Sequence, residues 1–277
     1  MRLAAVAIGG VVLGVTLFAA LVRLDILRGP FDPVLAGDIE LARSDRAGLR
    51  VLFVGNSLTA DNSLPELVHD FAASDDGADP IFAVQYVAGS WTFRQAARDE
   101  GLEALLRDVD WDVVVLQENG GVASHRAVWP REMFPAARTL DRTIAAAGAR
   151  TVLFMTWGRR EVFAPMQATI AEGYLRLGAE LQAATAPVGL AWAEALQRRP
   201  GLELWAADDY HPSPAGSYLA AAVFYAVLSG RDPAASDFSG GLPSAEARFL
   251  RQVDGFRGRA DRLAGAGGFA LGDRAKA

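Results

Sequence analysis

The sequence predicts an α/β protein, a three-layer α/β/α sandwich with a central parallel sheet of about five strands. Short apolar runs alternate along the chain with longer segments in which apolar residues recur at three- and four-residue spacing. Strands that alternate with helices pair in parallel through right-handed crossovers, which places helices on both faces of the sheet. Hydrophobic residues make up 51% of the 277 residues and charged residues 22%, which allows a sizeable core.

The predicted strands are the short apolar runs. The first, at 51–54, ends at Gly55 and has the unbroken apolar character of a strand that is buried on both faces. Comparable runs follow at 81–87, 113–116 and 151–156, and a weaker one lies at 187–190.

The predicted helices lie between these runs, at 64–73, 93–106, 131–147 and 166–184. A further helix is expected at 214–228, because Pro214 suits the first turn of a helix and Ser213 can cap it. One more amphipathic helix is predicted at 244–256.

The chain divides into four predicted segments. Residues 1–28 form a hydrophobic signal anchor or signal peptide, 29–48 a linker, 49–232 the sheet domain, and 233–277 a C-terminal helix with a flexible tail. Residues 3–22 carry no charge and as a helix would span about 30 Å, which is enough for a bilayer core. This length favours an uncleaved anchor, with a domain outside the cytoplasm; cleavage would instead give a secreted protein.

Composition excludes several classes of function. The net charge is −6 and the arginines are scattered, which argues against a nucleic-acid partner. The absence of cysteine excludes disulfides, thiolate metal sites and a cysteine nucleophile. No cluster has metal-ligand spacing and no glycine-rich phosphate loop is present, so neither a metal nor a cofactor is expected. Imidazole chemistry is limited to His69, His125 and His211, of which His69 falls in a predicted helix and His125 in a loop.

Candidate functional residues follow the ends of the predicted strands. In an open parallel sheet, ligands bind beyond the carboxyl ends of the strands. The segments at these positions, and before the helix at 214–228, are Gly55-Asn56-Ser57-Leu58-Thr59, Ala88-Gly89-Ser90, Gln117-Glu118-Asn119-Gly120 and Asp208-Asp209-Tyr210-His211-Pro212-Ser213.

The order of these segments resembles the SGNH hydrolase superfamily, also called GDSL esterases and lipases, over residues 50–228. The Gly-Asp-Ser-Leu block of that family reads Gly55-Asn56-Ser57-Leu58 here, its second-block glycine is Gly89, its Gly-x-Asn-Asp block reads Gln117-Glu118-Asn119-Gly120, and its Asp-x-x-His block is Asp208 to His211. The resemblance implies a flavodoxin-like sheet. Asn56, Gln117 and Gly120 depart from the family pattern, and Gln-Glu-Asn after a valine-rich strand is similar to a divergent bacterial branch.

The resemblance also implies a mechanism and the residues that perform it. Ser57 would be the nucleophile, His211 its base, and Asp208 the acid that orients the imidazole. The oxyanion hole would consist of the Ser57 and Gly89 backbone N–H groups and the Asn119 side-chain amide. Residues beside these segments are expected to contact the substrate: Asn56, Gln117, Glu118, Trp91, Trp157 and Tyr210.

The expected function is a serine esterase acting on small acyl esters, such as acetyl groups on carbohydrate. Two alternatives stay open. One is acyl transfer to a sugar hydroxyl at the same site, and the other is a non-catalytic surface-binding or assembly module, because a fold does not fix a function. The expected partners are an ester substrate and, through the N-terminal helix, the membrane.

Overall fold

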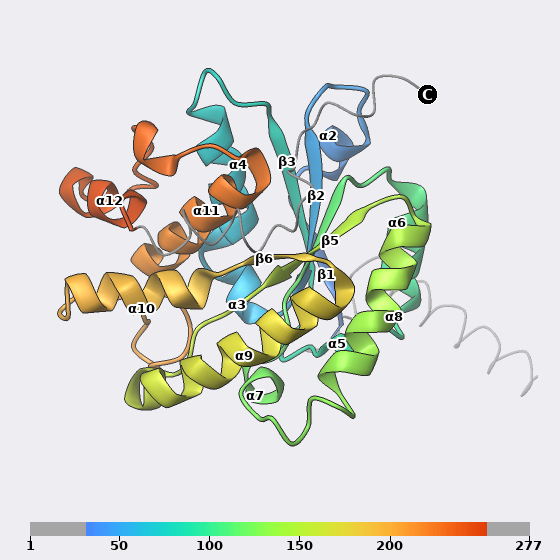
Figure 1. The fold of residues 1–277 in the computed structure, drawn as a ribbon. Helices are drawn as coiled ribbons and strands as arrows, with labels where there is room; N and C mark the ends of the chain where they lie inside the picture. The colour runs from blue at the N-terminus through green and yellow to red at the C-terminus, as the bar shows by residue number, and fades with distance from the viewer. Residues whose placement is uncertain (1–31, 254–277) are drawn as a thin grey trace, which may run out of the picture.

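The computed structural model describes residues 32–253 and confirms the predicted three-layer sandwich (Figure 1). Its sheet has six strands in the order β1-β3-β2-β4-β5-β6. All neighbouring pairs are parallel except β1, which is antiparallel to β3. The strands are β1 Val34–Ala36, β2 Leu49–Gly55, β3 Ile81–Val87, β4 Val113–Leu116, β5 Arg150–Phe154 and β6 Ala184–Ala186.

Helices cover both faces of the sheet. On one face lie α4 (Leu64–Ala73), α10 (Val188–Arg198) and α11 (Pro214–Ser229), and α12 (Ser244–Arg251) packs against α11. On the other face lie α6 (Glu100–Asp108), α8 (Met133–Ala146) and α9 (Phe163–Leu181). Figure 1 shows α4 and α11 on the opposite side of the sheet from α6 and α8. The short helices are α2 Ile39–Arg43, α3 Ser57–Ala60, α5 Phe93–Ala96 and α7 Gly120–Ala123.

The apolar character of β2 follows from burial on both faces. Val51 and Phe53 pack into the core beneath α4 and α11, whereas Leu52 and Val54 pack into the core beneath α6 and α8. A strand covered on both sides has no polar face, so its sequence shows no alternation.

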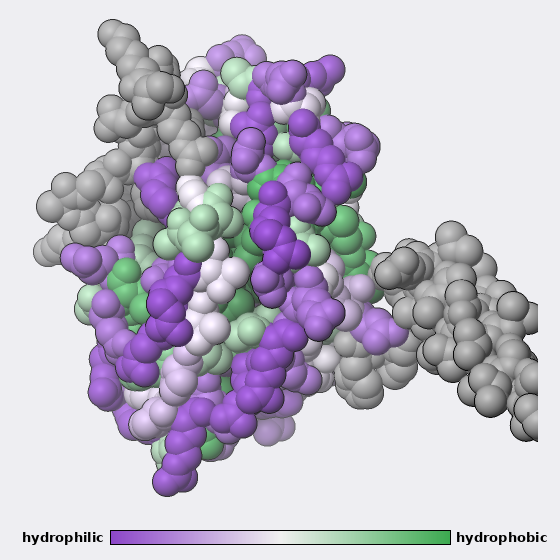
Figure 2. Space-filling view, turned by 90° about the vertical axis from the view of Figure 1, so that its right-hand side faces the viewer, coloured by the Kyte–Doolittle hydropathy of each residue, from purple (hydrophilic) through white to green (hydrophobic). Residues whose placement is uncertain are grey.

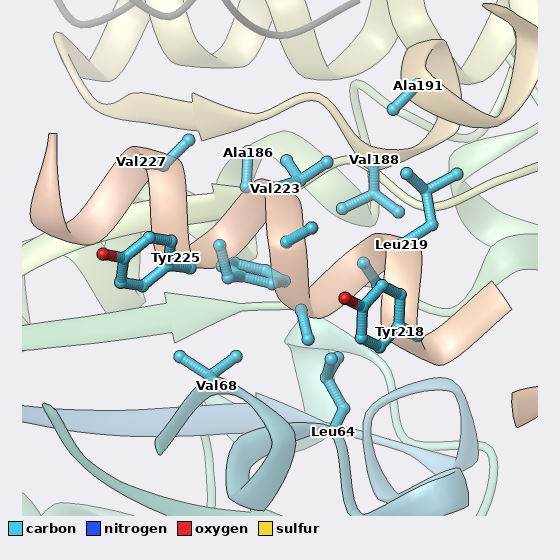
Figure 3. Packing of buried hydrophobic residues seen from close by; sticks show 14 of the residues in the cluster. Leu64, Val68, Ala186, Val188, Ala191, Tyr218, Leu219, Val223, Tyr225 and Val227 are labelled. Carbon is cyan, nitrogen blue, oxygen red and sulfur yellow. The ribbon is translucent and has the colours of Figure 1, made fainter. Parts of the chain in front are cut away.

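Helix α11 is buried almost all round. It contacts α4, α10 and α12, which leaves little of its surface for solvent. Its start is fixed by Ser213, whose Oγ accepts a hydrogen bond from the Gly216 N–H at 3.1 Å. Figure 3 shows Tyr218, Leu219 and Val223 of α11. They pack between α4, with Leu64 and Val68, on one side and the end of β6 with the start of α10, at Ala186 and Val188, on the other. Complete burial of each such large side chain stabilises the fold by roughly 1.5–3 kcal/mol.

Two predicted segments differ from the structure. The predicted linker at 29–48 contains β1 and α2, and β1 pairs with the edge of β3 through only three residues, too few for a periodic pattern. The predicted strand at 187–190 is wrong, because β6 ends at Ala186 and Val188 already begins α10.

The predicted helix at 93–106 is two helices. Asp99 separates them, and its Oδ1 accepts a hydrogen bond from the Leu102 N–H at 2.7 Å, which caps α6. Of the predicted helix at 244–256, the structure describes the part up to residue 253 and places α12 within it.

The outer face of the layer that contains α6 and α8 is mainly hydrophilic, with isolated hydrophobic residues between the polar ones (Figure 2). Within residues 32–253, no helix has both the length and the apolar character required to cross a bilayer. The predicted anchor at 1–28 and the predicted tail beyond residue 253 lie outside the described residues.

Candidate active site

Three loops meet at the carboxyl edge of the sheet because their strands are neighbours. Strand β2 lies between β3 and β4, with Gly55 in register with Val87. The Gln117 N–H donates to the Val54 carbonyl at 2.9 Å, which continues the β2–β4 ladder past the end of β4. The segments that begin with Asn56, Ala88 and Gln117 are therefore adjacent in space although they are distant in sequence.

Ser57 is the first residue of α3, directly after β2. Asn56 caps this short helix, and its Oδ1 accepts a hydrogen bond from the Leu58 N–H at 3.2 Å. The structure places Ser57 Oγ 2.9 Å from His211 Nε2. The two side chains are separated by 154 positions in the sequence, so this contact comes from the tertiary fold.

His211 and Asp208 lie on one tight turn before α11. Asp208 Oδ1 accepts hydrogen bonds from the Tyr210 N–H at 3.0 Å and the His211 N–H at 2.9 Å, and Oδ2 is hydrogen-bonded to His211 Nδ1. The turn requires a left-handed residue, which is Asp209 with φ of 57°. The His211 side chain and these backbone donors lower the pKa of Asp208 to about 2.

The hydrogen-bond partners assign the tautomer of His211. The Asp208 carboxylate can only accept, so Nδ1 carries the proton. Nε2 is then left with a lone pair directed at Ser57 Oγ, and the serine hydroxyl donates to it. This arrangement allows His211 to take the proton of Ser57 while Asp208 stabilises the resulting imidazolium.

The backbone N–H groups of Ser57 and Gly89 follow β2 and β3, which are neighbours in the sheet. Gly89 is exposed in a turn in which the Trp91 N–H donates to the Ala88 carbonyl at 3.2 Å, and Ser90 is left-handed with φ of 57°. Within residues 32–253, no protein acceptor is paired with the Ser57 or the Gly89 N–H.

The amide of Asn119 is oriented by two hydrogen bonds. Its Oδ1 accepts from the Gly121 N–H at 2.9 Å, which turns Nδ2 toward the Ala88–Trp91 turn. Nδ2 donates to the Ser90 carbonyl at 3.2 Å, and its second N–H has no acceptor among the described residues. The Asn119 amide is therefore held beside the loop that contains Gly89.

Gln117 occupies the position of the third-block glycine and supports the turn that contains Ser57. Its Oε1 accepts hydrogen bonds from the Asn56 N–H at 2.9 Å and from Thr59 Oγ1 at 3.0 Å. Its Nε2 donates to the Glu118 carbonyl at 2.6 Å. Gln117 is 1% exposed, and the polar atoms of its side chain are directed at the protein, so it stabilises the loops.

Glu118 is completely buried and connects the two loops that carry Asn119 and Gly89. Its Oε1 accepts hydrogen bonds from the Asn119 N–H at 2.7 Å and the Phe93 N–H at 3.1 Å. Its Oε2 has no partner among the described residues. Burial raises the pKa of Glu118 to about 7, although the two backbone hydrogen bonds act to lower it.

Three other residues that were predicted to contact substrate are also buried. Asn56 donates from Nδ2 to the Trp91 carbonyl at 2.9 Å, and the Trp91 side chain packs into the core. Trp157 stacks on Trp192 and donates from Nε1 to the Tyr210 carbonyl at 3.0 Å, so it supports the histidine turn. Their polar atoms are directed at the protein, whereas Tyr210 lines the cavity described below.

The structure adds two residues that the sequence pattern does not single out. Asn62, in the short 3₁₀ turn Asp61–Ser63, donates from Nδ2 to the Pro212 carbonyl at 3.0 Å and to Ser217 Oγ at 2.9 Å. It ties the segment after Ser57 to the turn that carries His211. Burial raises the pKa of the neighbouring Asp61, while the nearby His211 opposes the shift. An asparagine soon after Ser57 is the one sequence signal for such a turn, because asparagine tolerates the left-handed conformation that Asn62 adopts here.

A cavity of about 610 Å³ lies beside Asn119 and Tyr210. Ser57 does not line it; it is bounded by residues that include Ser90, Asn119, His125, Arg159, Met166 and Tyr210. His125, predicted in a loop after β4, thus lies on the wall of this cavity. No group of three His, Asp or Glu side chains among residues 32–253 is arranged to bind a metal ion.

Comparison with known proteins identifies the fold and the superfamily. No family model matches the sequence, and no curated protein matches it. Among solved structures, a protein of Slackia heliotrinireducens assigned to the SGNH hydrolases is 27% identical, with a TM-score of 0.53 over 64% of this chain and 97% of that one. A protein of the DUF4886 family from Bacteroides uniformis is 13% identical, with a TM-score of 0.62 over 80% of this chain and 98% of that one, and it shows the fold alone.

With its site geometry and this similarity, the chain is a divergent member of the SGNH hydrolase superfamily, as the order of its motifs predicts. The class of activity that the superfamily defines is hydrolysis.

Proposed function

We propose that this protein is a serine ester hydrolase that acts through an acyl-enzyme. The observation that carries the proposal is the continuous chain of hydrogen bonds from Ser57 Oγ through His211 to the Asp208 carboxylate. A serine hydroxyl is a weak nucleophile until a base removes its proton, and here the base lies at hydrogen-bond distance in the required tautomer.

In the proposed reaction, Ser57 Oγ attacks the ester carbonyl carbon while His211 Nε2 takes the hydroxyl proton. The carbonyl oxygen becomes an oxyanion, which the Ser57 N–H, the Gly89 N–H and the Asn119 amide stabilise. The carbon–oxygen bond to the alcohol breaks as His211 returns the proton to that alcohol. Water, deprotonated by His211, then attacks the acyl-enzyme and releases the acid with Ser57 restored.

We propose small acyl esters, such as acetyl groups on carbohydrate, as the substrate class. The proposed location is outside the cytoplasm, with residues 1–28 as the anchor; both proposals rest on the sequence. Acyl transfer to a sugar hydroxyl uses the same groups, with the hydroxyl in place of water in the second step. A non-catalytic module is disfavoured by the Ser57–His211 contact at 2.9 Å, because such a module has no need of it.

The test is hydrolysis of p-nitrophenyl acetate by the full chain in detergent. Ser57→Ala should abolish the activity, and Asp208→Asn should reduce kcat by about three to four powers of ten. Asp209→Asn is the matched control, because its carboxylate pairs with Arg160 at 2.6 Å and not with His211. Equal losses in both aspartate variants, or full activity of Ser57→Ala, would contradict the proposal.

A sugar acceptor separates hydrolysis from transfer. If the protein is an esterase, adding methyl glucoside leaves the yield of free acetate unchanged. If it is a transferase, acetylated glucoside replaces free acetate among the products.

A further inference from the structure

The cavity beside Asn119 contains an arginine without a carboxylate partner. Among the described residues that line it, none is Asp or Glu, although the chain has 33 acidic residues against 27 basic ones. Arg159 forms no ion pair within residues 32–253, whereas the adjacent Arg160 pairs with Glu203 at 2.7 Å and with Asp209 at 2.6 Å. A wall that carries a permanent cation and no carboxylate among the described residues favours an anionic ligand over a cationic one.

The guanidinium of Arg159 is held against Tyr210, the residue that precedes His211. It lies over the Tyr210 ring, 4.3 Å from the ring centre. Tyr210 directly precedes His211, and the Tyr210 backbone is fixed by its hydrogen bond to Asp208 Oδ1. The cation is therefore positioned at the boundary between the cavity and the histidine turn.

The remaining walls supply apolar surface and a second polar group. Val162, which is 49% exposed, Pro165 and Met166 form an apolar strip beside Arg159. His125 Nδ1 must donate to the Gly121 carbonyl, 2.6 Å away, because a carbonyl can only accept. Arg159, in contrast, has a permanent positive charge, so it is the group in the cavity wall that attracts an anion.

We propose that this cavity binds an anionic group of the substrate, a carboxylate or a phosphate, on either the acyl or the alcohol portion of the ester. Arg159 determines this specificity. The inference rests on the proposed esterase function and specifies its substrate class. A guanidinium presents a planar set of N–H donors that matches carboxylate and phosphate oxygens, and the apolar strip suits a short hydrocarbon spacer between the ester and the anion.

The test compares two pairs of esters, each of which differs in one terminal group that is a carboxylate in one ester and uncharged in the other. 4-Acetoxybenzoate against 4-acetoxybenzamide places the anion on the alcohol side. Mono-p-nitrophenyl adipate against p-nitrophenyl hexanoate places it on the acyl side. In the wild-type chain, the anionic ester of at least one pair should have a kcat/KM about ten-fold higher, mainly through a lower KM.

Arg159→Gln should bring that ratio close to one, through a higher KM for the anionic ester. Arg199→Gln is the matched control, because Arg199 also lies over an aromatic ring, 3.7 Å from the centre of Phe249, and does not line the cavity. It should preserve the ratio. A ratio near one for both pairs in the wild type, or a preference that survives in Arg159→Gln, overturns the inference.

Binding to a variant without the nucleophile keeps the inference separate from the proposed function. Ser57→Ala should bind the preferred anionic ester about ten-fold more tightly than its neutral partner by calorimetry, and the double variant with Arg159→Gln should not. If the wild type cleaves no ester but this difference in affinity is present, the proposed function fails and the anion site stands. If neutral esters are cleaved and the difference is absent, the anion site fails alone.

Discussion

The side-chain Oε1 of Gln117 accepts a hydrogen bond from the backbone N–H of Asn56 at 2.9 Å, across the ends of two neighbouring strands. The same oxygen accepts from Thr59 Oγ1 at 3.0 Å, so one amide holds both ends of the turn that carries Ser57. The departure of Gln117 from the family's glycine thus has a structural role. Where a glycine has no side chain, Gln117 provides a buried amide that holds the turn containing Ser57.

Replacing Gln117 with alanine should destabilise the fold. The change leaves the buried Asn56 N–H and Thr59 hydroxyl without their acceptor, at a cost of about 2–4 kcal/mol. Urea unfolding measures this difference. Gln197→Ala is the control, since Gln197 is exposed on α10 and its loss should change stability by less than about 0.5 kcal/mol. Similar effects for the two variants would contradict the structural role.

Gly55 should tolerate no side chain because Gln117 lies against it. A Cβ at Gly55 would lie 2.5 Å from Gln117 Oε1 and 2.7 Å from Thr59 Oγ1. Gly55→Ala should therefore displace Gln117 and lower both the free energy of unfolding, by about 1–3 kcal/mol, and the activity. At Gly201 an added Cβ meets nothing within 4 Å, so Gly201→Ala should leave both unchanged. Wild-type activity in Gly55→Ala would show that the contact is dispensable.

Restoring the family's aspartate at position 56 should weaken this protein. Asn56 is 2% exposed and donates to the Trp91 carbonyl. An ionised aspartate has no proton to donate, so two acceptor oxygens would face each other at this position. We expect Asn56→Asp to lose about 1–3 kcal/mol near pH 7. The loss should shrink as the pH is lowered, because a protonated carboxyl can donate to the same carbonyl. Unfolding at pH 7 and at pH 4 checks both statements, and a more stable variant at pH 7 would refute them.

Glu118 should make the stability of the protein depend on pH. Its pKa rises from 4.5 to about 7 on folding, so the folded state binds a proton more tightly than the unfolded state between these values. The favourable contribution is complete below pH 4.5 and is lost as the pH rises through 7. Wild type should therefore lose up to about 3 kcal/mol relative to Glu118→Gln between pH 4.5 and 7. A difference between the two proteins that is independent of pH would contradict this account.

The sequence predicted the sheet layers well where strands are long and buried. Strand β3 was placed at its observed bounds, and α4 likewise, because each shows a clear apolar pattern over several turns or residues. The sequence did not predict β1 or the position of β6. Each has three residues and owes its conformation to pairing, β1 with β3 and β6 with β5. Pairing partners far away in the chain leave no local pattern.

For the site, the motif order located the segments but not the direction of their side chains. Ser57 and His211 lie at hydrogen-bond distance, whereas Gln117, Glu118 and Asn56 face the protein interior. After β4, Gln117 and Glu118 are both buried, whereas the next residue, Asn119, reaches the cavity. Arg159 and Asn62 come from segments without a motif, and only the tertiary fold brings them to the site.

The most direct measurement is covalent labelling of the full chain by a fluorophosphonate, followed by mass spectrometry of its peptides. The account predicts one phosphonylated residue, Ser57, because His211 activates this hydroxyl at 2.9 Å. Labelling should be lost in His211→Ala and retained in His125→Ala. A folded wild-type protein that takes up no label, or label on another serine, would contradict the central claim.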